Sequence, residues 1–187
     1  MINASLDPKP ALVVIDLQKG IVSSPTAHPV SDILAHAAAL AEAFRRHSLP
    51  VVLVNVNGRA PGRTEQPSRL RIEDLPPTWT ELVPELDQQP EDHRITKQTW
   101  GAFTKTGLEA LLKGLGVTQI VLAGVSTSAG VESTARQAYE LGFNVVLATD
   151  AMTDTNADAH ANSVARIFPR LGEIGASQEI IQILDQR

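Results

Sequence analysis

Short apolar runs alternate with amphipathic segments along most of the chain. Four of these runs are rich in Val, Ile and Leu and are bounded by turn residues, which is typical of strands buried on both faces of a parallel sheet. They are Ala11–Ile15, Pro50–Val56, Ile120–Ala123 and Asn144–Ala148. Alternation of such strands with helices predicts an open, doubly wound α/β sheet.

Helical spacing of apolar residues predicts a helix after each of several strands. The first covers Ser31–His47 with Ser31 as its N-cap, and a second covers Gly107–Leu115 with Thr106 as its cap. Further along lie helices over Ala129–Leu141 and Asp158–Phe168, followed by a short strand or turn and a C-terminal helix within Ile174–Leu184. We therefore expect residues 1–187 to form a single domain.

Residues 57–89 depart from this alternation because they are rich in Pro, Gly and charge. A connection of that length inside a compact domain is usually functional or disordered. Trp79 within it predicts packing, either over a site or against a partner chain.

Composition excludes several classes of protein. A chain of 187 residues with 43% hydrophobic residues can bury the core of one domain, and its net charge of −5 disfavours nucleic acids and anionic membranes as partners. The absence of cysteine rules out disulfides, zinc–thiolate sites and a cysteine nucleophile. The net charge favours small molecules or other proteins as partners. Without a signal-peptide pattern or an apolar run of the ~18 residues that a membrane span needs, we expect a cytoplasmic protein.

Asp16 and Lys97 are the strongest candidates for chemistry. Asp16 directly follows a buried strand, at the carboxyl end where open α/β sheets place ligands, although it could instead cap the next loop. Lys97 ends the extended segment His93–Lys97 and precedes Trp100-Gly-Ala-Phe103, a predicted pocket wall. Considered alone, Lys97 is interpreted as a surface lysine. Beside a buried aspartate, however, its ammonium group would balance the negative charge and stabilise a developing oxyanion.

The segment 124–130 joins a strand to a helix, so N–H groups of the first helical turn are expected to favour anionic groups. Gly130 would let a ligand approach the backbone, or would merely permit a tight turn. No hydroxyl there has an adjacent histidine pattern, and no histidine pair has metal-ligand spacing, so we expect neither metal nor cofactor. Asp150 and Asp154 are predicted to cap helices or brace loops.

The ordered motifs of this chain resemble those of the isochorismatase-like hydrolase family, which includes cysteine amidohydrolases such as nicotinamidases as well as isochorismatases. The resemblance covers nearly the whole chain, and its motifs are Leu12–Gln18, Lys97 with Trp100–Phe103, Ala123–Arg136, Leu141–Asp154 and Ile167–Glu173. It implies a three-layer α/β/α sandwich with a six-stranded parallel, Rossmann-like sheet. It also implies an Asp–Lys–Cys triad matching Asp16 and Lys97, and a cis peptide at Val125–Ser126.

Gly130 stands where this resemblance implies the nucleophilic cysteine, so the thioester route of the amidohydrolases is closed. The isochorismatase branch works without that cysteine and uses the aspartate as a general acid. The resemblance thus implies a hydrolase of a small metabolite acting through Asp16 and Lys97, to which Gly130 contributes only backbone. Two alternatives stay open: a catalytically silent member that binds or regulates, and an engineered replacement of a native cysteine by Gly130.

The remaining expectations concern the substrate and partners. Residues in or beside the motifs are expected to contact the substrate: Gln18, Trp100, Val125, Ser126 and Ala129. Ser126–Ser128 differs from the Tyr-Ala-His typical of isochorismatases, and residues 54–59 lack the metal ligands of nicotinamidases, which argues against a metal. The family implies a homo-oligomer, either a dimer or a tetramer. Four loop arginines are compatible with an acidic ligand, although solvated loop charge explains them as well: Arg59, Arg63, Arg69 and Arg71.

Overall fold

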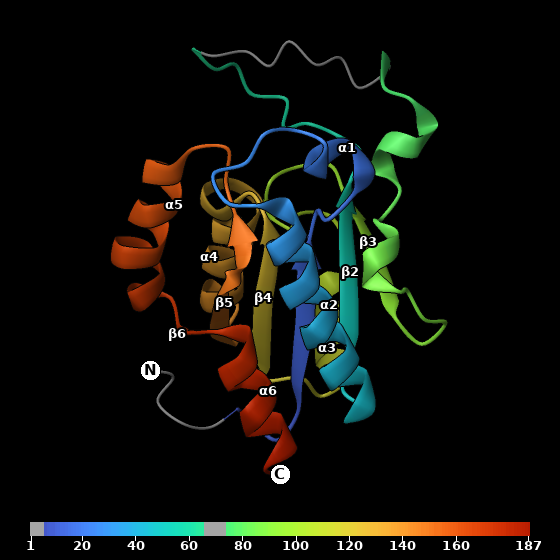
Figure 1. Ribbon diagram of the computed structural model, residues 1–187, viewed down its shortest axis with the longest axis vertical. Coiled ribbons are helices and arrows are strands. Elements are labelled where there is room, and N and C mark those ends of the chain that lie inside the picture. The colour runs from blue at the N-terminus through green and yellow to red at the C-terminus, as the bar shows by residue number, and fades with distance from the viewer. Residues whose placement is uncertain (1–5, 66–73) are drawn as a thin grey trace.

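A single six-stranded parallel sheet organises the computed structural model, which describes residues 6–65 and 74–187 (Figure 1). Its strand order is β3-β2-β1-β4-β5-β6, and every neighbouring pair runs parallel. The strands are β1 (Pro10–Ile15), β2 (Val51–Val56), β3 (His93–Lys97), β4 (Gln119–Val125), β5 (Asn144–Thr153) and β6 (Glu173–Gly175). The predicted doubly wound sheet is therefore confirmed.

Helices cover both faces of this sheet, as the predicted three-layer sandwich requires (Figure 1). One apolar cluster joins the sheet to α2 (Val30–Arg46) and α6 (Ser177–Asp185). A second joins the other face to α3 (Leu108–Gly114) and α4 (Glu132–Glu140). Two shorter α-helices complete the α-helices of the described residues, α1 (Lys19–Val22) and α5 (Ala157–Asn162).

The strand order reverses direction at β1 and β4, which pair from Pro10↔Gln119 to Ile15↔Gly124. All residues of both strands are buried, which explains why they read as continuous apolar runs. In open α/β sheets the crevice for a ligand lies outside the carboxyl ends of the strands at such a switch point. Asp16 and Ser126 follow these two strand ends directly.

Local details differ from the sequence expectations. Helix α2 begins at Val30 after Pro29, and the Ser31 hydroxyl donates a hydrogen bond to the Asp32 carboxylate. The prediction that Ser31 caps this helix was therefore wrong. Pro29 is the N-cap residue instead, and its carbonyl oxygen accepts hydrogen bonds from the Asp32 and Ile33 N–H groups at 3.2 and 3.5 Å. Thr106 lies before the N-cap residue Gly107, yet its hydroxyl accepts a hydrogen bond from the Leu108 N–H at 3.3 Å.

Within the described parts of the connection over residues 57–89, which are residues 57–65 and 74–89, Leu82 and Val83 lie beside the chain that follows β1. These parts contain two short 3₁₀ turns, Pro77–Thr80 and Pro84–Leu86, and Leu82 forms an antiparallel bridge with Gln18. Arg69 and Arg71 lie outside the described residues. Over the two described ranges, no helix combines the length and apolarity needed to cross a membrane.

Candidate active site

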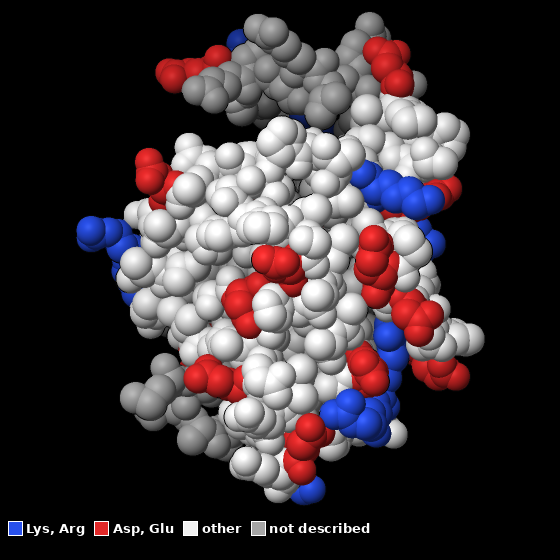
Figure 2. Space-filling view, viewed as in Figure 1, with Lys and Arg blue, Asp and Glu red and all other residues white. Residues whose placement is uncertain are grey.

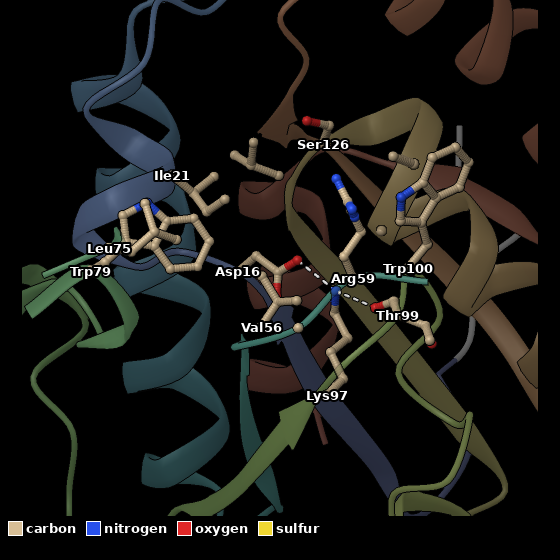
Figure 3. Close-up of a pocket in the computed structure, with 14 residues that line it drawn as sticks. Asp16, Ile21, Val56, Arg59, Leu75, Trp79, Lys97, Thr99, Trp100 and Ser126 are labelled. Atoms are coloured by element: carbon tan, nitrogen blue, oxygen red, sulfur yellow. Dashed lines mark hydrogen bonds and ion pairs between the residues drawn. The ribbon is translucent and has the colours of Figure 1, made fainter. Parts of the chain in front are cut away.

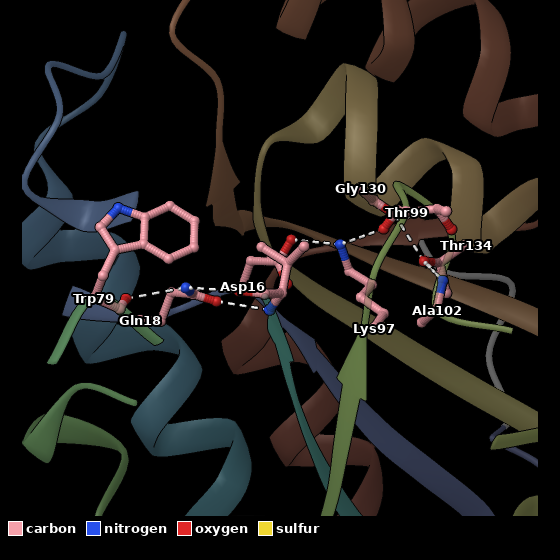
Figure 4. Close-up of polar contacts among 9 residues, drawn as sticks. Asp16, Gln18, Trp79, Lys97, Thr99, Ala102, Gly130 and Thr134 are labelled. Atoms are coloured by element: carbon pink, nitrogen blue, oxygen red, sulfur yellow. Dashed lines mark hydrogen bonds and ion pairs between the residues drawn. The ribbon is translucent and has the colours of Figure 1, made fainter. Parts of the chain in front are cut away.

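A buried ion pair joins Asp16 to Lys97 at the carboxyl edge of the sheet (Figure 4). The Lys97 Nζ lies 2.7 Å from the Asp16 Oδ2, and the two residues are only 2% and 5% exposed. Their strands, β3 and β1, are not neighbours, so the long lysine side chain reaches past the end of β2. Lys97 also donates to the carbonyl oxygen of Thr99 at 3.0 Å, which leaves one of its three N–H donors for a ligand.

Burial sets the acidity of Asp16. Desolvation raises the pKa of its carboxyl from 3.8 to about 6, although the charge and hydrogen bond of Lys97 pull in the opposite direction. The backbone at Asp16 has a φ of 52°, a left-handed conformation that Asp tolerates better than most residues. A carboxyl that titrates near neutral pH is suited to proton transfer.

A cavity of about 280 Å³ opens above this pair (Figure 3). Its described lining is mostly apolar and comprises Asp16, Ile21, Val56, Gly58, Arg59, Leu75, Trp79, Lys97, Thr99, Trp100, Val125, Ser126, Ala129 and Gly130. Within the described part of the chain, the only buried side-chain atoms without a hydrogen-bond partner are Asp16 Oδ1 and Thr99 Oγ1. Both residues belong to this lining, and unsatisfied polar atoms of this kind call for a functional explanation.

Gly130 leaves the floor of the cavity open beside Asp16. It lies in a single π-helical turn, Thr127–Val131, and a Cβ there would stand 3.3 Å from Asp16 Oδ2 and 3.0 Å from Ile15 Cγ2. Unlike Gly124, which has a φ of 120°, Gly130 does not adopt a positive φ. The turn conformation therefore does not require glycine, whereas the close approach to Asp16 favours it.

The turn is braced from behind by side chains outside the cavity. The Asp154 carboxylate accepts hydrogen bonds from the Ser128 N–H and hydroxyl, both at 2.8 Å, which confirms its predicted role in bracing a loop. The peptide bond between Val125 and Ser126 is cis, as expected. The Ala129 N–H donates to Ser126 O at 3.2 Å, so the anion-binding N–H groups expected here are partly used within the turn.

Two further polar clusters lie near this edge of the sheet. The Thr127 hydroxyl lies 2.8 Å from His160 Nδ1, a contact between distant residues that no local sequence pattern signalled. Thr127 is fully buried and does not line the cavity, so the contact supports the turn from behind. Asp150 accepts hydrogen bonds from the Ser177 N–H and hydroxyl at 2.7 Å each, which confirms its predicted capping role at the start of α6.

The expected substrate-contacting residues divide into two groups. Trp100, Val125, Ser126 and Ala129 line the cavity, and Trp100 is 63% exposed. Gln18 is fully buried outside the lining, and its side-chain amide donates to the carbonyl oxygens of Val56 and Trp79 and accepts from the Val56 N–H (Figure 4). Gln18 thus holds the Trp79 wall in place.

The residues that the structure describes contain no cluster of three or more His, Asp or Glu side chains able to hold a metal ion. His93 and His160 do not share a common centre. His93 begins β3, at the opposite end of that strand from Lys97, and His160 contacts Thr127. The chemistry that this arrangement supports directly is proton transfer and charge stabilisation by Asp16 and Lys97.

The chain is similar to known proteins over most of its length. The isochorismatase domain family matches residues 10–179. The isochorismatase family protein YecD of Escherichia coli O157:H7 is 40% identical over 93% of this chain and 95% of its own length. Nicotinamidase 3 of Arabidopsis thaliana is 32% identical over 80% of this chain and 76% of its own.

A solved structure shows the same fold over almost the entire length. The isochorismatase family protein of Burkholderia thailandensis superimposes with a TM-score of 0.92 at 39% identity, covering 99% of this chain and 100% of its own. The family match, the similar proteins and the shared fold all agree. The chain therefore belongs to the isochorismatase family of hydrolases.

Proposed function

We propose that this protein hydrolyses a small metabolite without a covalent intermediate, with Asp16 as the acid–base group and Lys97 as its partner. The observation that carries the proposal is the buried 2.7 Å pair at the floor of a cavity where position 130 has no side chain. A substrate atom can then approach Asp16 Oδ2 directly. One well-placed acid or base contributes typically about 10²–10⁴-fold to the rate, which is enough for turnover without a nucleophile.

In this mechanism the protonated Asp16 carboxyl gives its proton to the substrate, and water adds to the activated centre. The proton that the water loses returns to the Asp16 carboxylate, so the group is regenerated. Lys97 stabilises the carboxylate formed between the two transfers, and its remaining N–H can donate to negative charge on the substrate. The chain contains no cysteine, so a thioester intermediate is excluded.

A second candidate is a binding or regulatory protein that keeps the pocket without catalysis. The observation that favours it is the lack of an activated nucleophile among the described lining residues. Ser126 and Thr99 supply hydroxyls, but neither is hydrogen-bonded to a histidine or carboxylate. Tight binding of a metabolite without its conversion would favour this candidate, whereas turnover that requires Asp16 would contradict it.

We also propose that the protein is a homo-oligomer, a dimer or a tetramer. Trp100 is 63% exposed although it lines the cavity, and a second chain would cover this apolar surface. Light scattering at micromolar concentration is expected to give a mass of at least two chains, and a monomer mass would contradict the proposal.

Replacing Asp16 by Asn is expected to lower turnover by about 10²-fold or more, because the amide cannot supply the proton. The first assay is incubation with isochorismate, with loss of the enolpyruvyl group followed by chromatography. The thermal unfolding midpoint of each protein controls for folding. Activity of the variant equal to that of the wild type would rule out the mechanism, and no turnover by either protein would exclude this substrate.

The rate should depend on pH through Asp16. A general acid works while protonated, so kcat is expected to fall as pH rises through the pKa of about 6. Lys97 lowers this pKa, so Lys97→Met should move the descending limb to higher pH while also reducing the maximal rate. A rate that rises through the same range would instead identify Asp16 as a general base.

Adding one methyl group at position 130 tests whether the open floor matters. In Gly130→Ala the new Cβ would lie 3.3 Å from Asp16 Oδ2, so we expect a large loss of turnover with a folded protein. Gly114→Ala is the matched control, because a Cβ there meets nothing within 4 Å. Equal activity of the two variants would show that the substrate does not occupy the space beside Gly130.

A further inference from the structure

We infer that His160 is a positioning residue for the site, whose neutral imidazole holds the turn Thr127–Val131 in place and whose protonation releases that hold. The turn matters because it carries Ala129 and Gly130, which line the cavity beside Asp16. His160 lies outside the described lining of the cavity, so it takes no part in proton transfer to the substrate. Its effect on turnover rests on the proposed function, whereas its contact with the turn can be tested without a substrate.

The contact that carries this role joins His160 Nδ1 to the Thr127 hydroxyl at 2.8 Å. Thr127 is fully buried, and within the described ranges of the chain this nitrogen is the only hydrogen-bond partner of its hydroxyl. When His160 is neutral and carries its proton on Nε2, Nδ1 accepts a hydrogen bond from the hydroxyl. When His160 is protonated, Nδ1 becomes a donor, and the buried O–H loses its acceptor. The neutral imidazole therefore satisfies the turn, and the imidazolium does not.

A second histidine shows that this consequence is particular to His160. The Nδ1 of His36 lies 3.0 Å from the Ser177 hydroxyl, but that hydroxyl already donates to the Asp150 carboxylate at 2.7 Å. Ser177 can thus accept a hydrogen bond from a charged His36 while its own proton stays bound. The same pair of groups therefore favours a neutral ring only where the hydroxyl has no other acceptor, as at Thr127.

The groups around His160 also favour its neutral form. The ring of His28 meets that of His160 edge-on, with 4.6 Å between the ring centroids, so two protonated rings would repel each other. Burial lowers the pKa of His160 and the charge of His28 lowers it further, whereas Asp154 acts in the opposite direction. Residues 23–29, which carry His28, include no Lys, Arg, Asp or Glu, and their part of the surface is uncharged in Figure 2.

Three further charged side chains belong to the elements around His160. They are Asp158 on α5 itself, Arg166 in the turn that follows α5, and Glu132 at the start of α4. Among the described residues, none of the three forms a hydrogen bond or an ion pair with the His160 ring. The charges that act on this ring are therefore those of the neighbouring histidine and of Asp154.

Release of the turn would be felt at the reacting group. A Cβ at position 130 would lie 3.3 Å from Asp16 Oδ2, so the turn approaches this carboxylate closely. Thr127 and Ser128 fix the start of the turn through their contacts with His160 and Asp154. Protonation of His160 removes the first of these two contacts, and the approach of a substrate to Asp16 depends on where the turn lies.

Nitrogen-15 NMR of the histidine rings in the full chain tests the protonation state without a substrate. At neutral pH we expect His160 to be uncharged, with its proton on Nε2, and its resonances are identified by their absence in His160→Gln. As pH falls, the backbone amide signals of Ala129 and Gly130 should follow the titration of the His160 ring. A proton on Nδ1 at neutral pH, or amide signals that ignore this titration, would overturn the inference.

The pH profile of turnover tests the positioning role. Wild-type kcat is expected to fall on the acid side of its optimum as His160 becomes protonated, by roughly tenfold, as for a buried donor left without its acceptor. His160→Gln cannot titrate and its amide can still accept a hydrogen bond from Thr127, so this acidic fall should be absent. His160→Phe keeps a ring without an acceptor, so kcat should be lowered across the whole range. Thermal unfolding midpoints show whether each variant is folded.

His36→Gln is the matched control, because His36 also contacts a hydroxyl but lies away from the turn. It should keep the acidic fall of the wild type. Loss of that fall in His36→Gln, or its persistence in His160→Gln while Asp16 remains essential, would reject the positioning role and leave the proposed function intact. A protein that hydrolyses nothing, but in which the Ala129 and Gly130 amides follow the His160 ring, would support the role of His160 and count against the proposed function alone.

Discussion

The pairing of Asp16 with Lys97 is the interaction on which the site depends. Neither charge could stay buried alone, because an isolated ion in a low-dielectric interior is very costly, and removing one partner leaves the other uncompensated. The pair spans the end of β2, so its 2.7 Å contact exists only because three strands hold their relative register. Burial and pairing together bring the pKa of Asp16 to about 6, which neither effect alone would produce.

Buried polar side chains outside the cavity hold its walls in position. Gln18 connects the end of β2 to Trp79, and Asp154 binds the backbone of the turn that carries Ala129 and Gly130. Each uses its hydrogen-bonding groups on the protein itself, so their contribution to function is geometric. The reactive groups thereby rest on rigid strand ends, and the lining loops are tied to those same ends.

Two glycines of the β4–α4 connection meet different physical demands. Gly124 has a φ of 120° and lies against the backbone of Ile15, so the fold itself requires glycine there. Gly130 has ordinary backbone geometry, and its missing side chain opens the approach to Asp16. The proposed hydrolysis relies on that opening, because the substrate must contact Asp16.

The sequence by itself determined the parallel α/β sheet and the nomination of Asp16, because strands buried on both faces leave continuous apolar runs and ligands gather at their carboxyl ends. Local capping signals were less reliable, because Ser31 was predicted to cap α2, whereas the helix begins at Val30 after Pro29. Only the tertiary structure decided that Lys97 reaches Asp16, that Arg59 lines the cavity and that Gln18 does not. These outcomes depend on strand order and loop packing, which bring together residues whose separation along the chain carries no information about distance.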